Sequence, residues 1–496
     1  MSKPYAVVLS DVHIGDNSPT NWYQASVHEP RLVELLDWVV DHASEIRELI
    51  LLGDLVDIWT YPPDVEPPTM AQIIAANPNT LGPGGALARA VAALPGQVTL
   101  LLGNHDGQLT QADLDALYGA VGQLNFVPGG VHTVTGDSGA STTFAHGHLW
   151  TMFNAPDPNS PWNELPVGHF VTRAFAYHLQ KTLQPGQTAA DLPGMDSPNG
   201  FDLSSFLSSL SPSSLDVAGA LLNYVATAAV MPTDTPIVLP GGTTVSYSDA
   251  YNAYENLFSR WAQQWGSTTA ALRAACADQW GKYLVWYAQR LAIEQTSNLV
   301  VFGHTHQPVS GIAPSPVNYI NSGYECVSNP DMPAAEFTFT LVDLEAASGQ
   351  IFQLAPSGQG GPQPFPAPVL PPIVAPAMDF SCYATVTNQT GGALTLDALQ
   401  PPAYGTWVVP PPPSIAPGAS AMIWLQDNTG PHGSEGAFSY NNGSLKFSFE
   451  CPTGLWPNSC SGPNGNFVAR SGTSGWGARG SCPSWGHPLQ IKYTVA

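Results

Sequence analysis

Basic residues are scarce in this chain of 496 amino acids. It contains 14 Lys and Arg against 37 Asp and Glu, which gives a formal net charge of −23 at pH 7. A surface with this balance repels polyanions, so a protein that tracks along nucleic-acid backbones is disfavoured. Because few cations are available for ion pairs, stability must come mainly from apolar burial.

Long hydrophobic runs are missing as well. No stretch of the sequence approaches the roughly 18 apolar residues of a membrane-spanning helix. The first residues lead at once into Tyr5–Ser10, which has the character of a core strand and not of a cleavable leader. We therefore expect a cytoplasmic protein without a signal peptide, or one exported by an unconventional route.

Cysteines are few and unevenly placed. Two, Cys276 and Cys326, precede the last quarter of the chain, and that quarter contains Cys382, Cys451, Cys460 and Cys482. No Cys-x-x-Cys spacing occurs, which argues against a structural zinc site. The last four could form two disulfides, for which three pairings are possible and a loop from Cys451 to Cys460 is the easiest to close. A reducing compartment would keep them as buried thiols instead.

What the chain does contain is five short polar patches, each directly after an apolar run. The patches are Asp11-Val-His13, Gly53-Asp54-Leu-Val-Asp57, Gly103-Asn104-His105-Asp106, His146-Gly-His148 and Gly303-His304-Thr-His306. The runs before them are Ala6–Ser10, Leu49–Leu52, Val98–Leu102, Thr142–Ala145 and Leu299–Phe302, which we interpret as buried strands. Side chains at the carboxyl ends of such strands gather at one edge of an open α/β sheet.

Carboxylate, imidazole and amide ligands at one sheet edge suit two divalent metal ions such as manganese, iron or zinc. Two cations about 3.5–4 Å apart repel each other, so an anionic bridge is needed, and Asp54 is the natural candidate. Such a pair would bind phosphate and lower the pKa of a bridging water, giving hydroxide at neutral pH.

In order and local spacing, the five patches resemble the calcineurin-like metallophosphoesterase superfamily. The resemblance implies that the metal ligands are Asp11, His13, Asp54 and His306 for one ion, and Asp54, Asn104, His146 and His304 for the other. It also implies that His105 protonates the leaving group and that Asp57 orients His105. Asn321-Ser-Gly323 fits the Asn-Ser/Thr-Gly turn of the same superfamily.

Within the superfamily, the residues Leu-Leu-Gly-Asp-Leu-Val-Asp-Ile-Trp that end at Trp59 look like the branch of the UDP-diacylglucosamine diphosphatases. That branch carries a helical lid between its fourth and fifth patches. The present chain departs from it in a much longer interval from His146 to His304, and in His148 where the branch has Asp. His148 could contact substrate or simply make loop hydrogen bonds. For Asp106 we expect a helix cap.

Helices are predicted by apolar periodicity on both sides of the patches. The expected segments are Arg31–His42, Asp113–Gly119, Val167–Leu183, Leu215–Val230, Tyr251–Trp265 and Ala270–Gln295. The segment Val167–Leu183 would begin the lid, and we favour a solvated face for its Arg173 and His178 over a contact with phosphate or sugar. The lid aromatics, Trp261, Trp265, Trp280, Tyr283, Trp286 and Tyr287, are expected to be core, with lining of an apolar substrate pocket as the alternative.

Domain organisation follows from composition. Residues 1–355 would form the metallophosphoesterase domain, with the helical insertion at about 160–295, hairpins at Thr133–Ala145 and Ile237–Ser246, and a closing hairpin from Glu336 to Leu354. Residues 356–377 are dense in Pro and Gly with almost no charge, which is typical of a semi-rigid linker. Residues 378–496 show short alternating runs separated by Gly/Asn turns, which predicts a β-sandwich.

The last domain resembles the aegerolysin family in Thr387-Asn-Gln-Thr, Gly405-Thr-Trp407, Glu435-Gly-Ala-Phe-Ser-Tyr440 and Phe447-Ser-Phe-Glu-Cys-Pro452. That family consists of small β-sandwiches associated with membrane lipids. Five tryptophans could form a lipid- or sugar-facing patch, although core packing is the alternative we favour for most of them: Trp407, Trp424, Trp456, Trp476 and Trp485.

The predicted fold class is therefore α/β: a metallophosphoesterase β-sandwich core flanked by helices, with a large helical insertion and a C-terminal all-β sandwich. The predicted function is that of a dinuclear-metal phosphoesterase, which cleaves a small or lipid-linked phosphodiester or pyrophosphate through a metal-bridging hydroxide. The expected partners are this substrate and a membrane lipid surface, with no nucleic acid. The alternatives are a catalytically silent lipid- or glycan-binding effector and a metal-dependent nuclease.

Overall fold

The computed structural model describes twelve stretches of the chain. They are residues 3–162, 165–192, 202–209, 216–265, 268–278, 281–312, 318–323, 337–354, 361–370, 379–428, 432–453 and 456–496. Trp280, Cys326 and much of the predicted linker lie outside these residues. In the described part, no helix has the length and apolar character needed to cross a bilayer.

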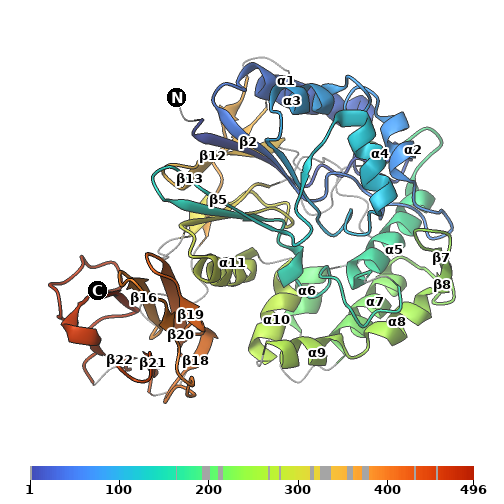
Figure 1. Ribbon diagram of the computed structural model, residues 1–496. Helices are drawn as coiled ribbons and strands as arrows, with labels where there is room; N and C mark the ends of the chain where they lie inside the picture. Colours follow the sequence, from blue (N-terminus) through green and yellow to red (C-terminus); the bar gives the residue numbers. More distant parts are fainter. Residues whose placement is uncertain are drawn as a thin grey trace. The chain divides into compact units, whose positions relative to one another are not determined.

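Two compact units make up the structure (Figure 1). Unit 1 comprises Met1–Leu284, Val301–Gly311 and Tyr319–Val369, and unit 2 comprises Val285–Val300, Ile312–Asn318 and Leu370–Ala496. The chain passes from unit 1 to unit 2 within the short strands β10 (Gly311–Ile312) and β15 (Val369–Leu370).

Unit 1 is built on a mixed seven-stranded sheet. Its order is β14 (Gln363–Pro364), β13 (Ser348–Gln353), β12 (Thr338–Asp343), β1 (Tyr5–Leu9), β2 (Ile46–Leu52), β3 (Val98–Leu101) and β4 (Asn125–Phe126). From β1 to β4 the strands are parallel, whereas β12 and β13 run antiparallel to their neighbours. The carboxyl ends of β1, β2 and β3 therefore meet at one edge, which is where the first three polar patches begin.

A second sheet of four strands has the order β11 (Asn318–Asn321), β9 (Leu299–Phe302), β6 (Ser141–Ala145) and β5 (Val131–Thr135). The strands β5 and β6 form the predicted hairpin, paired from Val131 with Ala145 to Thr135 with Ser141. Because β6 and β9 end directly before His146 and Gly303, the fourth and fifth patches follow strands of this sheet.

Four helices accompany the strands of the larger sheet: α1 (Ala25–Asp41), α2 (Met70–Ala76), α3 (Ala86–Ala93) and α4 (Gln111–Val121). The helix α1 buries Leu32, Leu35, Leu36 and Val39, whose three- and four-residue spacing places them on one face. They join a core with Val7, Leu49 and Val98 of the sheet. Helix α1 begins six residues before the predicted start, because Pro30 is accommodated inside its N-terminal part.

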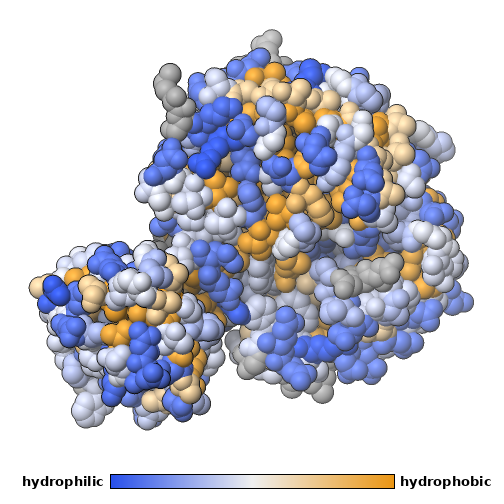
Figure 2. Space-filling view, viewed as in Figure 1, coloured by the Kyte–Doolittle hydropathy of each residue, from blue (hydrophilic) through white to orange (hydrophobic). Residues whose placement is uncertain are grey.

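The insertion between the fourth and fifth patches is helical. It contains α5 (Val167–Thr182), α6 (Leu203–Ser208), α7 (Val217–Ala228), the predicted hairpin of β7 (Pro236–Val238) and β8 (Thr244–Ser246), α8 (Tyr247–Tyr254), α9 (Leu257–Gln264) and α10 (Thr268–Cys276). Hydrophilic residues cover much of its visible surface in Figure 2, around α8 and α9.

Two of the long helices predicted in the insertion are wrong in extent. The segment Tyr251–Trp265 is divided between α8 and α9, since the chain breaks at Glu255 and Asn256. The segment Ala270–Gln295 is divided between α10 and α11 (Gly281–Gln295), and most of α11 groups with unit 2, where Trp286 donates a hydrogen bond to Gln426 over 3.1 Å. Apolar periodicity continues across both breaks, so it does not reveal them.

The expectation for Arg173 is also wrong. Its side chain is fully buried, and Nη2 donates hydrogen bonds to the carbonyl oxygens of Pro63, Val65 and Val238 at 2.7–3.1 Å. The guanidinium thus joins the segment after the second patch to β7, instead of facing solvent or a substrate. The core interpretation of the lid aromatics agrees with the burial of Trp261, Trp286 and Tyr287.

The C-terminal part of unit 2, from Asp379 on, is a β fold with two principal sheets around one core. The first has the order β18 (Thr406–Val409), β20 (Ser420–Gln426), β16 (Cys382–Asn388), β25 (Leu489–Val495) and β24 (Phe467–Ser471). The second has the order β21 (Ser434–Tyr440), β22 (Leu445–Cys451) and β23 (Ser459–Ser461), and β17 (Leu394–Thr395) pairs with β19 (Ser414–Ile415). Residues of both principal sheets, such as Ile491 and Phe447, share one hydrophobic cluster. The predicted fold class is confirmed.

One disulfide joins Cys460 to Cys482 in unit 2. The pairing that closes the shortest loop, Cys451 with Cys460, does not form, because Cys451 is a buried free thiol at the end of β22. Cys382 is also buried and free. The spacing along the sequence was therefore a poor guide to which cysteines meet.

Candidate metal centre

The loops that follow β1, β2 and β3 are tied together at the carboxyl edge of the sheet. The backbone N–H groups of Asp11 and His13 donate to the carbonyl oxygens of Gly53 and Asp54 at 3.1 and 2.8 Å. The buried Asp106 carboxylate accepts hydrogen bonds from the backbone N–H groups of Leu55 and Gly103. Asp106 thus fastens one ligand loop to the next and does not cap a helix as expected, and burial together with the Asp54 carboxylate raises the pKa of Asp106 to about 7.

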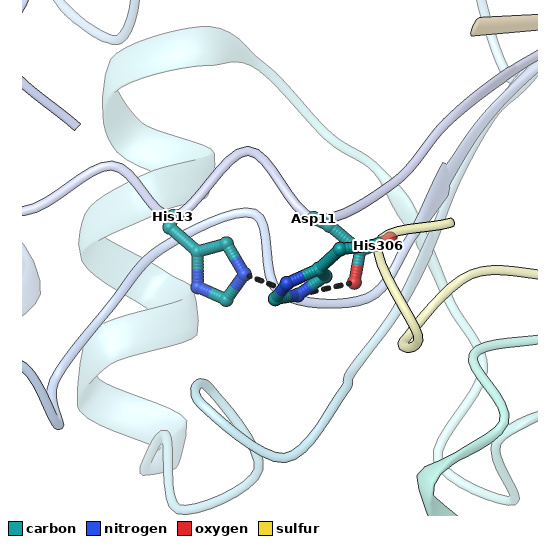
Figure 3. A group of neighbouring side chains, drawn as sticks. All are labelled: Asp11, His13 and His306. Atoms are coloured by element: carbon teal, nitrogen blue, oxygen red, sulfur yellow. Dashed lines mark hydrogen bonds and ion pairs between the residues drawn. The ribbon is translucent and has the colours of Figure 1, made fainter. Parts of the chain in front are cut away.

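The first group of ligand-type side chains consists of Asp11, His13 and His306 (Figure 3). The Nε2 atoms of His13 and His306 lie 3.3 Å apart, and His306 Nε2 lies 3.5 Å from Asp11 Oδ1. Asp11 and His13 come from the loop after β1, whereas His306 comes from the loop after β9 (Figure 3). All three side chains are almost fully buried.

The second group consists of Asp11, Asp54 and His146. His146 Nε2 lies 3.1 Å from Asp54 Oδ2 and 3.2 Å from Asn104 Oδ1. The other ring nitrogen, His146 Nδ1, is 2.8 Å from the carbonyl oxygen of Leu52 and must donate to it. This bond fixes the tautomer of a neutral His146, so that the lone pair of Nε2 faces the carboxylates as a metal ligand requires.

Asp54 lies between the two groups. Its Oδ1 accepts the backbone N–H of His105 at 2.8 Å, while its buried Oδ2 faces two imidazoles. That oxygen lies 3.8 Å from His13 Nε2 and 3.1 Å from His146 Nε2. A buried carboxylate is costly unless positive charge lies beside it, which a protonated His146 or a shared cation would supply.

The charge balance points the same way. Burial lowers the pKa of His146, but the carboxylates of Asp54 and Asp11 outweigh it and raise this pKa to about 9. A proton on His146 thus offsets part of the buried negative charge in the free protein. Divalent cations bound at the same place would supply that positive charge instead. The donor set of carboxylates, imidazoles and one amide oxygen fits such ions.

His304 is placed differently from the other expected ligands. Its backbone N–H donates to Asp11, but its Nε2 lies 2.6 Å from Asp278 Oδ1 and 3.1 Å from Thr151 Oγ1. Sequence reasoning missed Asp278, which follows α10 in the insertion and has no motif around it. A carboxylate from the insertion thus reaches the rim of the centre.

His105 and Asp57 form the expected pair beside the first group. His105 Nδ1 lies 3.2 Å from Asp57 Oδ1, and the backbone N–H groups of Trp59 and Thr60 donate to the same oxygen. Burial alone would raise the pKa of Asp57. The neighbouring His105 and His13 outweigh this effect and hold the pKa below its usual value, so the carboxylate is ionised. The indole of Trp59 stacks on His105 with ring centroids 4.3 Å apart, which holds the imidazole from its other side.

Backbone conformation also singles out this region. Asp11, His13, Asp54, His304 and His306 all have φ between 52° and 72°, the left-handed region that residues with a Cβ rarely adopt. Such conformations persist only where surrounding contacts enforce them, and they cluster at functional sites. Five strained residues in one buried cluster therefore support a functional centre.

Glycines next to the ligands permit the close approach of the loops. A Cβ on Gly103 would collide with the carboxylate of Asp54 and lie 2.7 Å from the ring of His146. A Cβ on Gly303 would meet Ser10 and lie 2.6 Å from Asp11 Oδ2. These two patches begin with glycine because the ligands of other loops occupy the space beside them.

A cavity of about 330 Å³ opens beside the centre. Asn104, His105, His304 and His306 line it from the centre, and residues of the insertion line it from other sides. His148, by contrast, is buried and does not line this cavity. Its ring lies 5.3 Å from that of His146, which makes it a packing neighbour of that ligand.

Comparison with known proteins finds one family match, in the N-terminal part of the chain. Residues 5–181 match the family model of the calcineurin-like phosphoesterases. The match covers the loops that carry Asp11, Asp54, Asn104 and His146, and it ends inside the insertion. The search of curated proteins found no match.

Solved structures align only distantly. The Escherichia coli phosphoesterase Yfce is 12% identical over 70% of this chain and 96% of its own, with a TM-score of 0.24. A dimetal phosphatase from Danio rerio is 13% identical over 70% and 94%, with a TM-score of 0.26. The lipid-binding protein Nakanori is 14% identical over 23% and 69%, with a TM-score of 0.17. Because these TM-scores are below 0.5, the assignment rests on the family match.

Proposed function

We propose that the calcineurin-like phosphoesterase domain of this chain holds two divalent ions and hydrolyses a phosphodiester or pyrophosphate bond. The observation that carries the proposal is Asp54, whose buried Oδ2 lies between the Nε2 atoms of His13 and His146, at 3.8 and 3.1 Å. In these two groups, the buried carboxylates of Asp11 and Asp54 face the imidazoles of His13, His146 and His306. Divalent cations from solution would supply the positive charge that a proton on His146 supplies in the free protein.

The ligands would divide between the two ions as the family resemblance implies. One ion would use Asp11, His13, Asp54 and His306, and the other Asp54, Asn104, His146 and His304. Manganese, iron and zinc all suit this set. When bound, the ions would polarise the phosphoryl group and lower the pKa of a water molecule. Occupation of the second position requires the His304 ring to exchange its contact with Asp278 for the metal.

The protein's own contribution to bond cleavage would come from His105. Its ring lines the cavity, and Asp57 on its Nδ1 side fixes the direction of the ring. Water would lose a proton to solvent and add to phosphorus, the bond from phosphorus to the leaving oxygen would break, and the proton from His105 would end on that oxygen. His105 would then regain a proton from solvent. The Trp59 stack keeps the imidazole in place throughout.

A direct test compares a chromogenic aryl phosphate monoester with the corresponding diester, with manganese added or removed by a chelator. We expect metal-dependent turnover that falls at least 10²-fold in Asn104→Ala, because the variant loses a ligand. Asn125→Ala, at an exposed asparagine of β4, is the matched control and should keep full activity. Turnover that survives chelation, or that is equal in Asn104→Ala, contradicts the proposal.

For unit 2 we propose binding to a lipid surface. Trp456 and Trp485 are 70% and 61% exposed, which is unusual for side chains of this size. Their loops lie side by side, because Asn458 bonds to Ser484 and Gly486. Trp424 is buried, so the core interpretation holds there but not for this pair.

Sedimentation with phosphatidylcholine vesicles tests the lipid proposal. The double variant Trp456→Ala, Trp485→Ala should lose most of the bound fraction, since the two indoles provide the exposed apolar area. Tyr404→Ala, at an exposed aromatic of another loop, is the control and should bind as the unaltered protein does. Equal binding by the double variant would reject these loops as the contact.

A further inference from the structure

The cavity beside the metal centre has two different walls. The catalytic wall carries His105 and the histidines of the fifth patch, whereas the insertion contributes mainly apolar side chains. The apolar lining consists of Phe153, Val171, Phe175, Leu203, Leu207, Leu221 and Ala275, and Trp22 adds an indole next to His13 and His105. A phosphoryl group at the centre would therefore place its organic substituent against hydrocarbon and aromatic rings.

The size of the cavity limits that substituent. Its volume of about 330 Å³ lies at the lower end of the roughly 300–1,000 Å³ found for small-molecule sites. A phosphoryl group with one aromatic ring or a short alkyl chain suits this space better than a bulky nucleotide does.

The charged side chains that line the cavity also limit which substituent the substrate can carry. Among the described residues that line the cavity none is Lys or Arg, while Asp202 and Asp278 contribute carboxylates. The arginine of α5, Arg173, is committed to three carbonyl oxygens on another side of the helix and does not line the cavity. A second anionic group on the substrate would meet these two carboxylates and no Lys or Arg of the described lining residues.

We infer that the natural substrate is a phosphodiester whose organic groups are compact and apolar and carry no further negative charge. This inference rests on the proposed function and narrows it, since pyrophosphates and nucleotides with several phosphates are disfavoured. The apolar insertion wall, represented by Phe175 and Leu207, would select the organic group. Asp202 and Asp278 would exclude anionic alternatives.

Two diesters that differ in one charge give the cleanest test. The first is p-nitrophenyl phenyl phosphate, and the second carries a carboxylate on the phenyl ring. At low ionic strength, where the repulsion is least screened, we expect kcat/KM to be about tenfold lower for the carboxylated compound. Phe175→Ala should lower kcat/KM for the uncharged diester several-fold, because the substituent loses a packing surface.

A pair of variants tests whether the carboxylate of Asp202 repels an anionic substituent. Asp202 caps α6 by accepting the N–H of Ser205 at 2.9 Å, and asparagine is an equally good cap, so Asp202→Asn removes charge without removing the cap. Asp216→Asn is the matched control, since Asp216 caps α7 in the same way but does not line the cavity. The difference between the two substrates should narrow in Asp202→Asn and stay unchanged in Asp216→Asn.

The possible results distinguish a failure of the substrate inference from a failure of the proposed phosphoesterase function. Metal-dependent turnover with equal or faster cleavage of the carboxylated diester overturns the inference and leaves the phosphoesterase intact. Absence of metal-dependent turnover for both diesters overturns the proposed function. Calorimetric binding of phenylphosphonate and 4-carboxyphenylphosphonate with manganese present tests the charge preference of the cavity separately from turnover. About tenfold weaker binding of the carboxylated compound is expected, and equal binding overturns the inference.

Discussion

At the level of single residues, the centre is defined by buried carboxylates and imidazoles in close contact. Asp11, Asp54 and Asp57 are at most 1% exposed, and histidines are their only nearby cationic partners in the two ligand groups and the His105 pair. Burial of carboxylates is costly unless each finds a partner of opposite charge. Divalent cations bound by these side chains would offset that cost, as the proposed metal site requires.

The pair of His105 and Asp57 makes a prediction about leaving groups. A proton donor matters most when the departing oxygen is strongly basic, so His105→Gln should slow an alkyl leaving group by about 10²–10⁴-fold and p-nitrophenolate far less. Asp57→Asn should show the same pattern at about 10–100-fold, since it acts through His105. The measurement is kcat for diesters with leaving groups of increasing pKa. Equal losses across the series would show that the pair only supports the fold.

His28 predicts how the stability of the protein responds to acid. Burial lowers its pKa to about 4, against about 6.5 in an unfolded chain. The native state therefore binds fewer protons than the unfolded state below pH 6.5, and stability is lost as the pH falls from 6.5 towards 4, by about 3 kcal/mol at the lower end. In urea unfolding, the free energy of unfolding of the wild type should fall more steeply between pH 6.5 and 4 than that of His28→Asn. Parallel pH dependence in the two proteins would contradict this assignment.

At the level of elements, the disulfide of unit 2 closes a loop between β23 and the segment before β25. The sequence separation of Cys460 and Cys482 is 22, for which restriction of the unfolded chain contributes about 3 kcal/mol. A reductant should lower the temperature of the unfolding transition of unit 2 by several degrees. The double variant Cys460→Ser, Cys482→Ser should unfold at the lower temperature with or without reductant. A reductant effect that persists in the double variant would point to other thiols.

Elements also show where sequence reasoning succeeds. The strand ends before Asp11, Asp54, Asn104 and His146 were predictable, because a short apolar run and the polar residues after it are neighbours in the sequence. The partner of Cys460, the burial of Arg173 and the approach of Asp278 to His304 were not, since each depends on segments far apart in the chain. Helix breaks such as Glu255–Asn256 were missed because the apolar pattern runs through them.

At the level of the whole molecule, the net charge of −23 and the lining of the cavity both disfavour polyanionic substrates. The chain as a whole disfavours polyanionic substrates, and the cavity adds two carboxylates without a basic lining residue. The band of hydrophobic residues on the visible face of unit 1 in Figure 2 shows that apolar side chains also reach the surface of this unit. A nuclease is accordingly the least compatible of the alternatives, while small phosphodiesters drawn in by the metals are the best matched.

The central claim is that two metal ions occupy the cluster around Asp54, and metal titration of the purified protein tests it most directly. After chelation, manganese is added stepwise while the bound ion and the rate of aryl phosphodiester hydrolysis are measured together. We expect two equivalents to bind, with turnover appearing as the second site fills, and both to be lost in Asp54→Asn. No binding of manganese, iron or zinc to the folded wild type, or turnover that is independent of the bound metal, would contradict the account.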